Sequence, residues 1–124
     1  MRRRCGCSGH GMHGPHRCEE MGFSMGDFLT AVVLNELSKG DMHGYELYER
    51  VSNLEYYPFK HDQSVLYSLL RKLSNHGLVE YRIEEGSGAP RKVYSITETG
   101  KEYLKELRIY IQKLKESFEA FLMS

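Results

Sequence analysis

The fold is decided by one stretch of the sequence, QSVLYSLLRKLSNHGLVE, at residues 63–80. Its leucines recur at steps of three and four residues, which predicts one buried stripe on a helix over about 63–75. Asp62 is the expected N-cap and Gly77 the expected stop. The stripe consists of Leu66, Leu69, Leu70 and Leu73, and the opposite face carries Ser64, Tyr67, Ser68, Arg71, Lys72 and Asn75.

Two further helices are predicted before this one. Apolar residues follow helical spacing from about residue 25 to residue 37, and Ser24 with Asp27 imitates a capping box. Gly40 is expected to end this helix as a left-handed cap. The next helix is expected to begin near residue 43 with Asp41 as its N-cap, and Tyr57-Pro58 should break it.

A β-hairpin and a long helix are predicted after it. Residues 78–83 alternate in polarity and residues 91–96 read as a returning strand, with a turn-rich Gly/Pro loop between them. The helix over about 98–122, capped by Thr97, carries an a/d heptad seam. The seam is formed by Leu104, Leu107, Ile111, Leu114, Phe118 and Phe121. A domain of this size does not need so long a stripe for its own core, so we expect a homodimer; the alternative is a helix lying wholly on its own domain.

The predicted fold class is therefore mainly α with a small β-hairpin (α+β). It comprises a winged helix-turn-helix over residues 23–97 and a C-terminal dimerisation helix over 98–124. In this arrangement the third helix can enter the major groove of double-stranded DNA. The expected DNA-binding residues are Ser64, Tyr67, Ser68, Arg71 and Lys72 on the helix and Arg91 and Lys92 in the wing. Taken alone, each of them is better explained as part of an ordinary solvated face, and it is their occurrence together on one helix and one hairpin that favours DNA binding.

Three blocks of sequence resemble the PadR family of regulators. They are MHGYEL at 42–47, VLYSLLRKL with NHGLVE over 65–80, and RKVYSITETG at 91–100. The similarity extends over roughly residues 28–104. It implies a dimeric, sequence-specific transcriptional regulator, usually a repressor, released from DNA by a small-molecule or other signal. The chain departs from the family pattern around Ser64 and Ser68, and it has no tryptophan, which argues against the flat aromatic-ligand pocket of some members.

Residues 1–22 differ from the rest in composition and are predicted to be a flexible tail rich in Cys, His and Gly. Six candidate metal ligands lie there: Cys5, Cys7, His10, His13, His16 and Cys18. Such a mixture suits zinc first, although copper(I) or an iron–sulfur cluster is chemically possible. The alternative is a basic tail that contacts phosphates. A metal- or redox-sensing protein whose winged helix contacts other proteins is thus the second hypothesis for function.

Composition excludes several other classes. The chain has 124 residues, with 17 basic and 17 acidic, and no apolar run long enough for a bilayer. We therefore expect a single folded domain in a cytoplasmic protein, with no membrane contact and no required cofactor. Paired carboxylates, a Ser/His/Asp arrangement and a phosphate-binding glycine loop are missing from the sequence, so an enzyme is not expected. Zero net charge means that DNA binding would depend on where the cations are placed.

Overall fold

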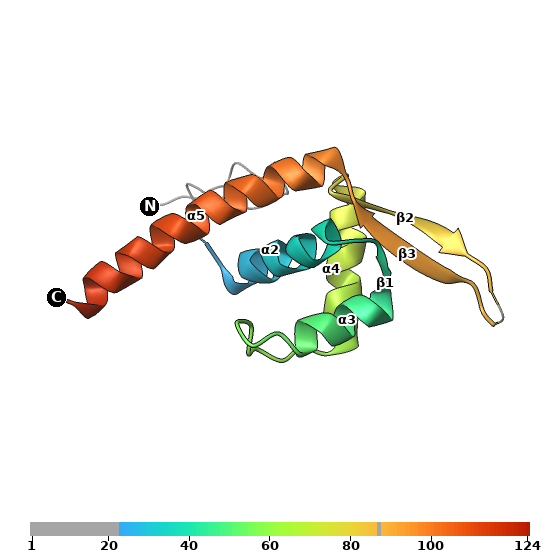
Figure 1. The fold of residues 1–124 in the computed structure, drawn as a ribbon, viewed down its shortest axis with the longest axis horizontal. Coiled ribbons are helices and arrows are strands. Elements are labelled where there is room, and N and C mark those ends of the chain that lie inside the picture. Colours follow the sequence, from blue (N-terminus) through green and yellow to red (C-terminus); the bar gives the residue numbers. More distant parts are fainter. Residues whose placement is uncertain (1–22, 87) are drawn as a thin grey trace.

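The computed structural model describes residues 23–86 and 88–124. Along these residues the elements are α2 (Met25–Ser38), β1 (Met42–His43), α3 (Gly44–Ser52), α4 (Gln63–Asn75), β2 (Val79–Glu84), β3 (Arg91–Ile96) and α5 (Glu98–Leu122). Figure 1 shows α2, α3 and α4 packed together, with the β2–β3 hairpin projecting from one end and α5 running past α2 at the other. This is the predicted winged helix-turn-helix with a long C-terminal helix.

The sheet has one strand more than the predicted hairpin. Its order is β1-β3-β2, all antiparallel, and Met42 and His43 of β1 pair with Tyr94 and Val93 of β3. A strand of two residues is too short to show any periodicity, so the sequence could not reveal it. Through β1, the base of the hairpin is hydrogen-bonded to the segment that joins α2 to α3.

The central helix is α2, which is buried on nearly all sides. Its buried residues are Leu29, Thr30, Ala31, Val32, Val33, Leu34, Glu36 and Leu37. The predicted capping box is confirmed: the Ser24 hydroxyl accepts from the Asp27 backbone N–H, and the Asp27 carboxylate accepts from the Ser24 backbone N–H at 2.9 Å. These bonds satisfy orphan N–H groups of the first turn and define where the helix begins.

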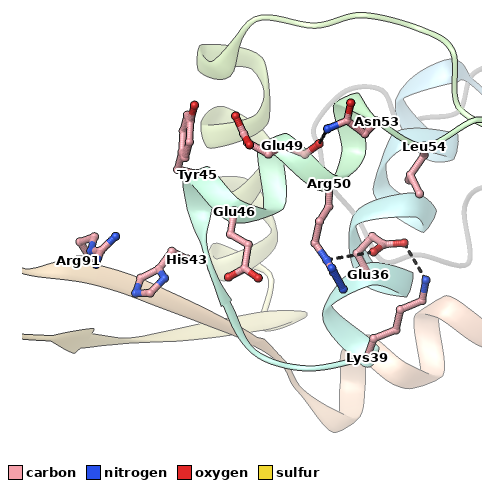
Figure 2. A pocket seen from close by; sticks show the side chains of 10 residues that line it. All are labelled: Glu36, Lys39, His43, Tyr45, Glu46, Glu49, Arg50, Asn53, Leu54 and Arg91. Atoms are coloured by element: carbon pink, nitrogen blue, oxygen red, sulfur yellow. Dashed lines mark hydrogen bonds and ion pairs between the residues drawn. The ribbon is translucent and has the colours of Figure 1, made fainter.

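A buried carboxylate fastens α2 to α3. Glu36 is 2% exposed, and its two oxygens lie 3.0 Å from Lys39 Nζ and 3.5 Å from Arg50 Nε. In Figure 2 both cations reach the same carboxylate from opposite sides. Because a buried charge without a partner is costly, this arrangement fixes how Arg50 on α3 lies against the end of α2.

Two predicted caps between α2 and α3 are wrong. The α2 C-cap is Lys39, and Gly40 has an extended backbone (φ 159) where a left-handed cap was expected. The N-cap of α3 is His43, because β1 intervenes between Asp41 and the helix. Asp41 instead accepts a hydrogen bond from Arg82 Nη1 at 2.9 Å, which ties this segment to β2.

The helix α4 and its ends agree with the prediction. Leu66, Leu70 and Leu73 are buried and Leu69 is partly buried, and Asp62 occupies the N-cap position without a capping hydrogen bond from its side chain. Gly77 follows the helix with φ 76, a left-handed conformation that favours glycine. The turn is short, and β2 begins two residues later at Val79.

The long helix α5 divides into two halves. Thr97 caps it as predicted, with its hydroxyl accepting from the Gly100 N–H at 3.0 Å. Leu104 and Leu107 are buried in the chain's own core, whereas Phe118 and Phe121 are 60% and 74% exposed. The predicted seam is therefore partly core, and only its distal half is uncovered. Within the described residues, no helix combines the length and apolarity that crossing a membrane requires.

Candidate nucleic-acid interface

The outer face of α4 carries the five helix residues predicted to contact DNA. Ser64, Tyr67, Ser68, Arg71 and Lys72 are all exposed, while the leucine stripe faces the core. The amphipathic pattern causes this placement, because burying the stripe turns the polar positions outward. The helix thus presents hydroxyl, phenol, guanidinium and ammonium groups on one surface.

A cleft of about 570 Å³ lies between α4 and the wing, by which we mean β2, β3 and the loop joining them. Tyr67, Arg71, Ser74 and Asn75 line it from α4, Tyr81, Arg91, Lys92 and Tyr94 from the wing, and His43, Gly44 and Tyr45 from the start of α3. Four of the seven predicted DNA contacts therefore share one cavity. Ser64, Ser68 and Lys72 lie outside it, on the exposed surface of the same helix.

The cleft is positively charged. Arg71, Arg91 and Lys92 line it, and none of the described residues lining it is acidic. None of these three cations forms an ion pair within the part of the chain that the structure describes. In a chain of zero net charge, the cleft is a local concentration of positive charge, although Arg91 also lines a separate groove that contains Glu84 and Glu85.

The wing separates the two basic residues with which it lines the cleft, Arg91 and Lys92. Ile83 pairs with Lys92 and Glu84 with Arg91, so Arg91 and Lys92 extend from opposite faces of β3. Lys92 shares its face with Tyr81, and its Nζ lies 4.4 Å from the centre of that ring. On the other face, Glu84 lies 3.6 Å from His43 Nε2 and 3.5 Å from Arg82 Nη2. Glu84 therefore has basic neighbours on its own side of the sheet.

Four tyrosines are among the residues that line the cleft. Tyr94 is 8% exposed, and burial raises its pKa above the ordinary value near 10. Its ring centre lies 5.8 Å from that of Tyr81, its partner across the sheet. Tyr67 packs so closely on Gly44 that a Cβ there would lie 2.7 Å from the Tyr67 ring. Glycine at position 44 thus lets the α4 tyrosine lie against the start of α3.

Several lining residues were not predicted. The alternating pattern predicted that Tyr81 lies on one face of a strand, but it did not assign Tyr81 to a binding site. His43 and Tyr94 were not predicted to line a site either. The sequence feature that could have indicated Tyr81 is the alternation of Val79, Tyr81 and Ile83. A large aromatic ring on the exposed face of a strand is expected to pack against another side chain. Contacts between strands and a helix far apart in the chain leave no local pattern.

The second groove, of about 790 Å³, has a different character. Figure 2 shows it along α3, with Glu46 and Glu49 projecting from the helix and Glu36 below them. Lys39 and Arg50, which also line it, are already paired with Glu36. This mixture of charge does not favour a polyanion, and so the α4–wing cleft is the better candidate for one.

The predicted metal ligands Cys5, Cys7, His10, His13, His16 and Cys18 lie outside the described residues. Within residues 23–86 and 88–124, no group of three or more His, Cys, Asp or Glu side chains is placed to hold a metal ion. Of the sites predicted from the sequence, the one that the described residues contain is thus the polar face of α4 with the wing beside it.

The sequence from residue 33 to residue 106 matches the model of the transcriptional regulator PadR-like family. The chain belongs to the PadR-like family of transcriptional regulators. That match runs from the middle of α2 to the first half of α5, so it contains the whole α4–wing cleft. It also confirms the family resemblance of the three sequence blocks.

Two relatives illustrate the similarity. The chain is 34% identical over 115 residues to the transcriptional regulator YqjI of Escherichia coli, covering 92% of this chain and 53% of that protein. It is 29% identical over 92 residues to the negative transcriptional regulator PadR of Bacillus subtilis, covering 72% and 50% respectively. The chain thus spans about half the length of these two relatives.

Solved structures agree with the fold. A PadR family transcriptional regulator from Eggerthella lenta matches with a TM-score of 0.68 and 26% identity, over 76% of this chain and 80% of that one. Bacillus subtilis PadR in complex with operator DNA matches with a TM-score of 0.59 and 27% identity, over 65% and 46%. The second is a relative whose DNA-bound form has been determined.

Proposed function

We propose that this chain binds double-stranded DNA sequence-specifically, with α4 in the major groove and the wing on the neighbouring backbone. The observation that supports this most directly is the α4–wing cleft, with three unpaired cations and no acidic side chain among its described lining residues. Phosphates are the usual partners of such a surface, since DNA carries closely spaced negative charge. The operator complex of the Bacillus subtilis relative supports the same assignment.

The residues divide into two roles in this proposal. Ser64, Tyr67, Ser68 and Arg71 lie on the exposed face of α4, where they can meet base edges in a groove that accepts a helix. Lys72, Arg91 and Lys92 supply phosphate contacts that set the position of the protein on the duplex. Base contacts then provide specificity, and phosphate contacts provide most of the affinity.

The test is a titration of the full chain against fluorescently labelled duplexes, measured by anisotropy. Duplexes selected from a random pool are compared with a scrambled duplex over a range of salt concentrations. Binding should weaken steeply with salt, and Arg71→Ala should reduce affinity for the selected duplex by about tenfold or more. Lys105→Ala is the matched control, because it removes one exposed cation from α5, away from the cleft.

If the chain binds neither duplex at low salt, DNA is not its partner and the proposal is overturned. The runner-up function, a metal or redox sensor that uses its winged helix for protein contacts, would then be favoured. If Arg71→Ala and Lys105→Ala have equal effects, binding is a bulk charge effect and the assignment of α4 is wrong.

We further propose that the chain acts as a homodimer through α5. The distal half of this helix carries exposed Phe118, Phe121 and Leu122, and Figure 1 shows it running beyond α2. Apolar side chains at heptad spacing pair readily with a second copy of the same helix. Two copies would present two α4 helices to the DNA, which compensates for the small charge of each.

Sedimentation velocity over a range of chain concentrations tests the dimer. Phe118→Glu with Phe121→Glu should shift the protein to a monomer, because each charge would be placed in the apolar seam. Lys113→Glu, off the seam on the same half of α5, should leave the mass unchanged. A wild-type monomer at all concentrations would contradict the dimer.

Repression and response to an effector complete the proposal. The Bacillus subtilis relative is named a negative regulator, and a dimer bound at a promoter blocks access to it. A reporter gene with a selected operator should therefore be expressed less when this chain is present. Higher reporter expression would indicate an activator.

The effector proposed from the sequence is a small molecule or a metal ion, with zinc at the six Cys and His residues of the N-terminal segment as the first candidate. Native mass spectrometry of the full chain under reducing conditions tests the metal. Binding abolished by Cys5→Ser, Cys7→Ser and Cys18→Ser together would support it. Wild-type protein that takes up no metal would contradict it.

A further inference from the structure

The ring of Tyr81 lies between the hydrophobic core and a cation of the cleft. Its centre lies 5.8 Å from that of Tyr94, its partner across the sheet, with the two rings tilted by 54°, and Lys92 Nζ lies 4.4 Å from the Tyr81 ring centre. Tyr94 is 8% exposed, while Tyr81 is 45% exposed. The three side chains form a column that runs outward from the core to the cleft.

Such a column has a physical consequence for Lys92. A lysine on a projecting strand has four rotatable bonds and loses much conformational freedom when it binds a phosphate. The face of an aromatic ring attracts an ammonium group and restricts it before any ligand arrives. Restricting the bound position in advance reduces the entropy that binding must overcome.

We propose that Tyr81 is a positioning residue that holds the Lys92 ammonium in the α4–wing cleft, ready for a DNA phosphate. This inference rests on the proposed DNA binding. Lys92 shares the Tyr81 face of the wing, whereas Arg91 extends from the other face and has no ring contact among the described residues. The same sheet therefore presents one cation fixed by a ring and one that is not.

The first measurement needs no DNA. In the NMR spectrum of the full chain, the Lys92 ε-methylene protons should be shifted upfield by the ring current of Tyr81. Tyr81→Leu should abolish this shift, and Tyr81→Phe should keep it, because a phenyl ring also attracts cations. If the wild-type shift matches that of an exposed lysine such as Lys105, the placement of Lys92 is wrong, whether or not the chain binds DNA.

The second measurement is a double-mutant cycle on the affinity for a selected duplex. Tyr81→Leu should weaken binding about two- to fivefold per wing, the range expected for an exposed cation–π contact. Tyr81→Phe should be close to wild type. In a Lys92→Met background, Tyr81→Leu should cause no further loss, since the cation that it positions is already gone.

Salt dependence distinguishes this role from a merely structural one. Lys92→Met should reduce the slope of log affinity against log salt by about 0.9 for each phosphate that the lysine no longer neutralises. Tyr81→Leu keeps the ammonium, so it should weaken binding with a smaller change of slope than Lys92→Met, and Tyr81→Phe should not move the slope. Equal reductions in affinity from Tyr81→Leu with and without Lys92 would overturn the positioning role. A normal ring-current shift in a chain that binds no duplex would support the placement of Lys92 and overturn the proposed function.

Discussion

Among the glycines that the structure describes, Gly100 is the one where an added methyl group should do most damage. It lies in the first turn of α5, against the carbonyl of Leu78. A Cβ built at Gly100 would lie 2.1 Å from Leu78 O and 2.8 Å from Ile96 Cγ1. Real Cβ contacts are essentially never closer than 3.0 Å, so the backbone carbonyl or the helix has to move by about 0.9 Å.

The carbonyl that would have to move holds the α5 cap in place. Leu78 O accepts a hydrogen bond from the Thr97 backbone N–H at 3.1 Å, and the Thr97 hydroxyl lies 3.0 Å from it while donating at 2.6 Å to Gly77 O. Overpacking costs about 1–3 kcal/mol. A weakened hydrogen bond adds about 0.5–1.5 kcal/mol. Alanine recovers up to about 1 kcal/mol through its helix propensity. The net expectation for Gly100→Ala is a loss of about 2 kcal/mol in the free energy of unfolding.

Urea and thermal unfolding followed by circular dichroism measure this loss. For a domain of this size, about 2 kcal/mol corresponds to a fall in the melting temperature on the order of 10 °C. Wild type and variant must be compared at one chain concentration, because a dimer would be stabilised by mass action. Gly26→Ala is the matched control: it adds the same methyl group to the first turn of α2, where the nearest atom is Ser24 Oγ at 3.5 Å. If Gly100→Ala is as stable as Gly26→Ala, the close approach of α5 to Leu78 is refuted.

Three smaller predictions follow from other contacts. Gly44→Ala should displace the Tyr67 ring and lower the affinity for a selected duplex severalfold in anisotropy titrations, with little change in the free energy of unfolding. An unaltered affinity would contradict the role of Tyr67 in binding DNA. Ser24→Ala should lower the urea midpoint by the equivalent of about 1 kcal/mol through loss of the capping box; an unchanged midpoint would show that the cap is not needed. Burial raises the pKa of Tyr57 above 10, so the unfolded chain ionises first and stability should fall as pH rises past about 10. Tyr57→Phe should flatten that fall in urea midpoints measured across pH, and an identical decline in the variant would rule out Tyr57 as its source.

The local elements were within reach of the sequence alone. The leucine spacing of α4, the capping box at Ser24, the stop at Gly77 and the Thr97 cap each depend on groups within a few residues of one another. Such short-range hydrogen bonds and side-chain periodicities are written directly in the order of residues. The exposed polar face of α4 follows from them, because its leucine stripe must be buried.

Contacts between distant segments were decided only by the tertiary structure. Asp41 has the chemistry of an N-cap, yet it pairs with Arg82 because β1 joins the sheet there. The heptad seam continues without a break in the sequence, but packing on α2 takes Leu104 and Leu107 into the chain's own core and leaves Phe118 exposed. No local pattern separates the two halves of the seam, since burial depends on which neighbour is present.

The α4–wing cleft is the clearest case. The sequence identified Arg71, Arg91 and Lys92 as candidates from their place on a helix and a hairpin. It did not show that they share a cavity, nor that a ring at Tyr81 lies beneath one of them. Residue order sets which groups are exposed, whereas the crossing of a helix and a sheet sets which exposed groups meet. Exposure depends on interactions between residues a few positions apart, whereas the contacts between exposed groups depend on the packing of the whole core.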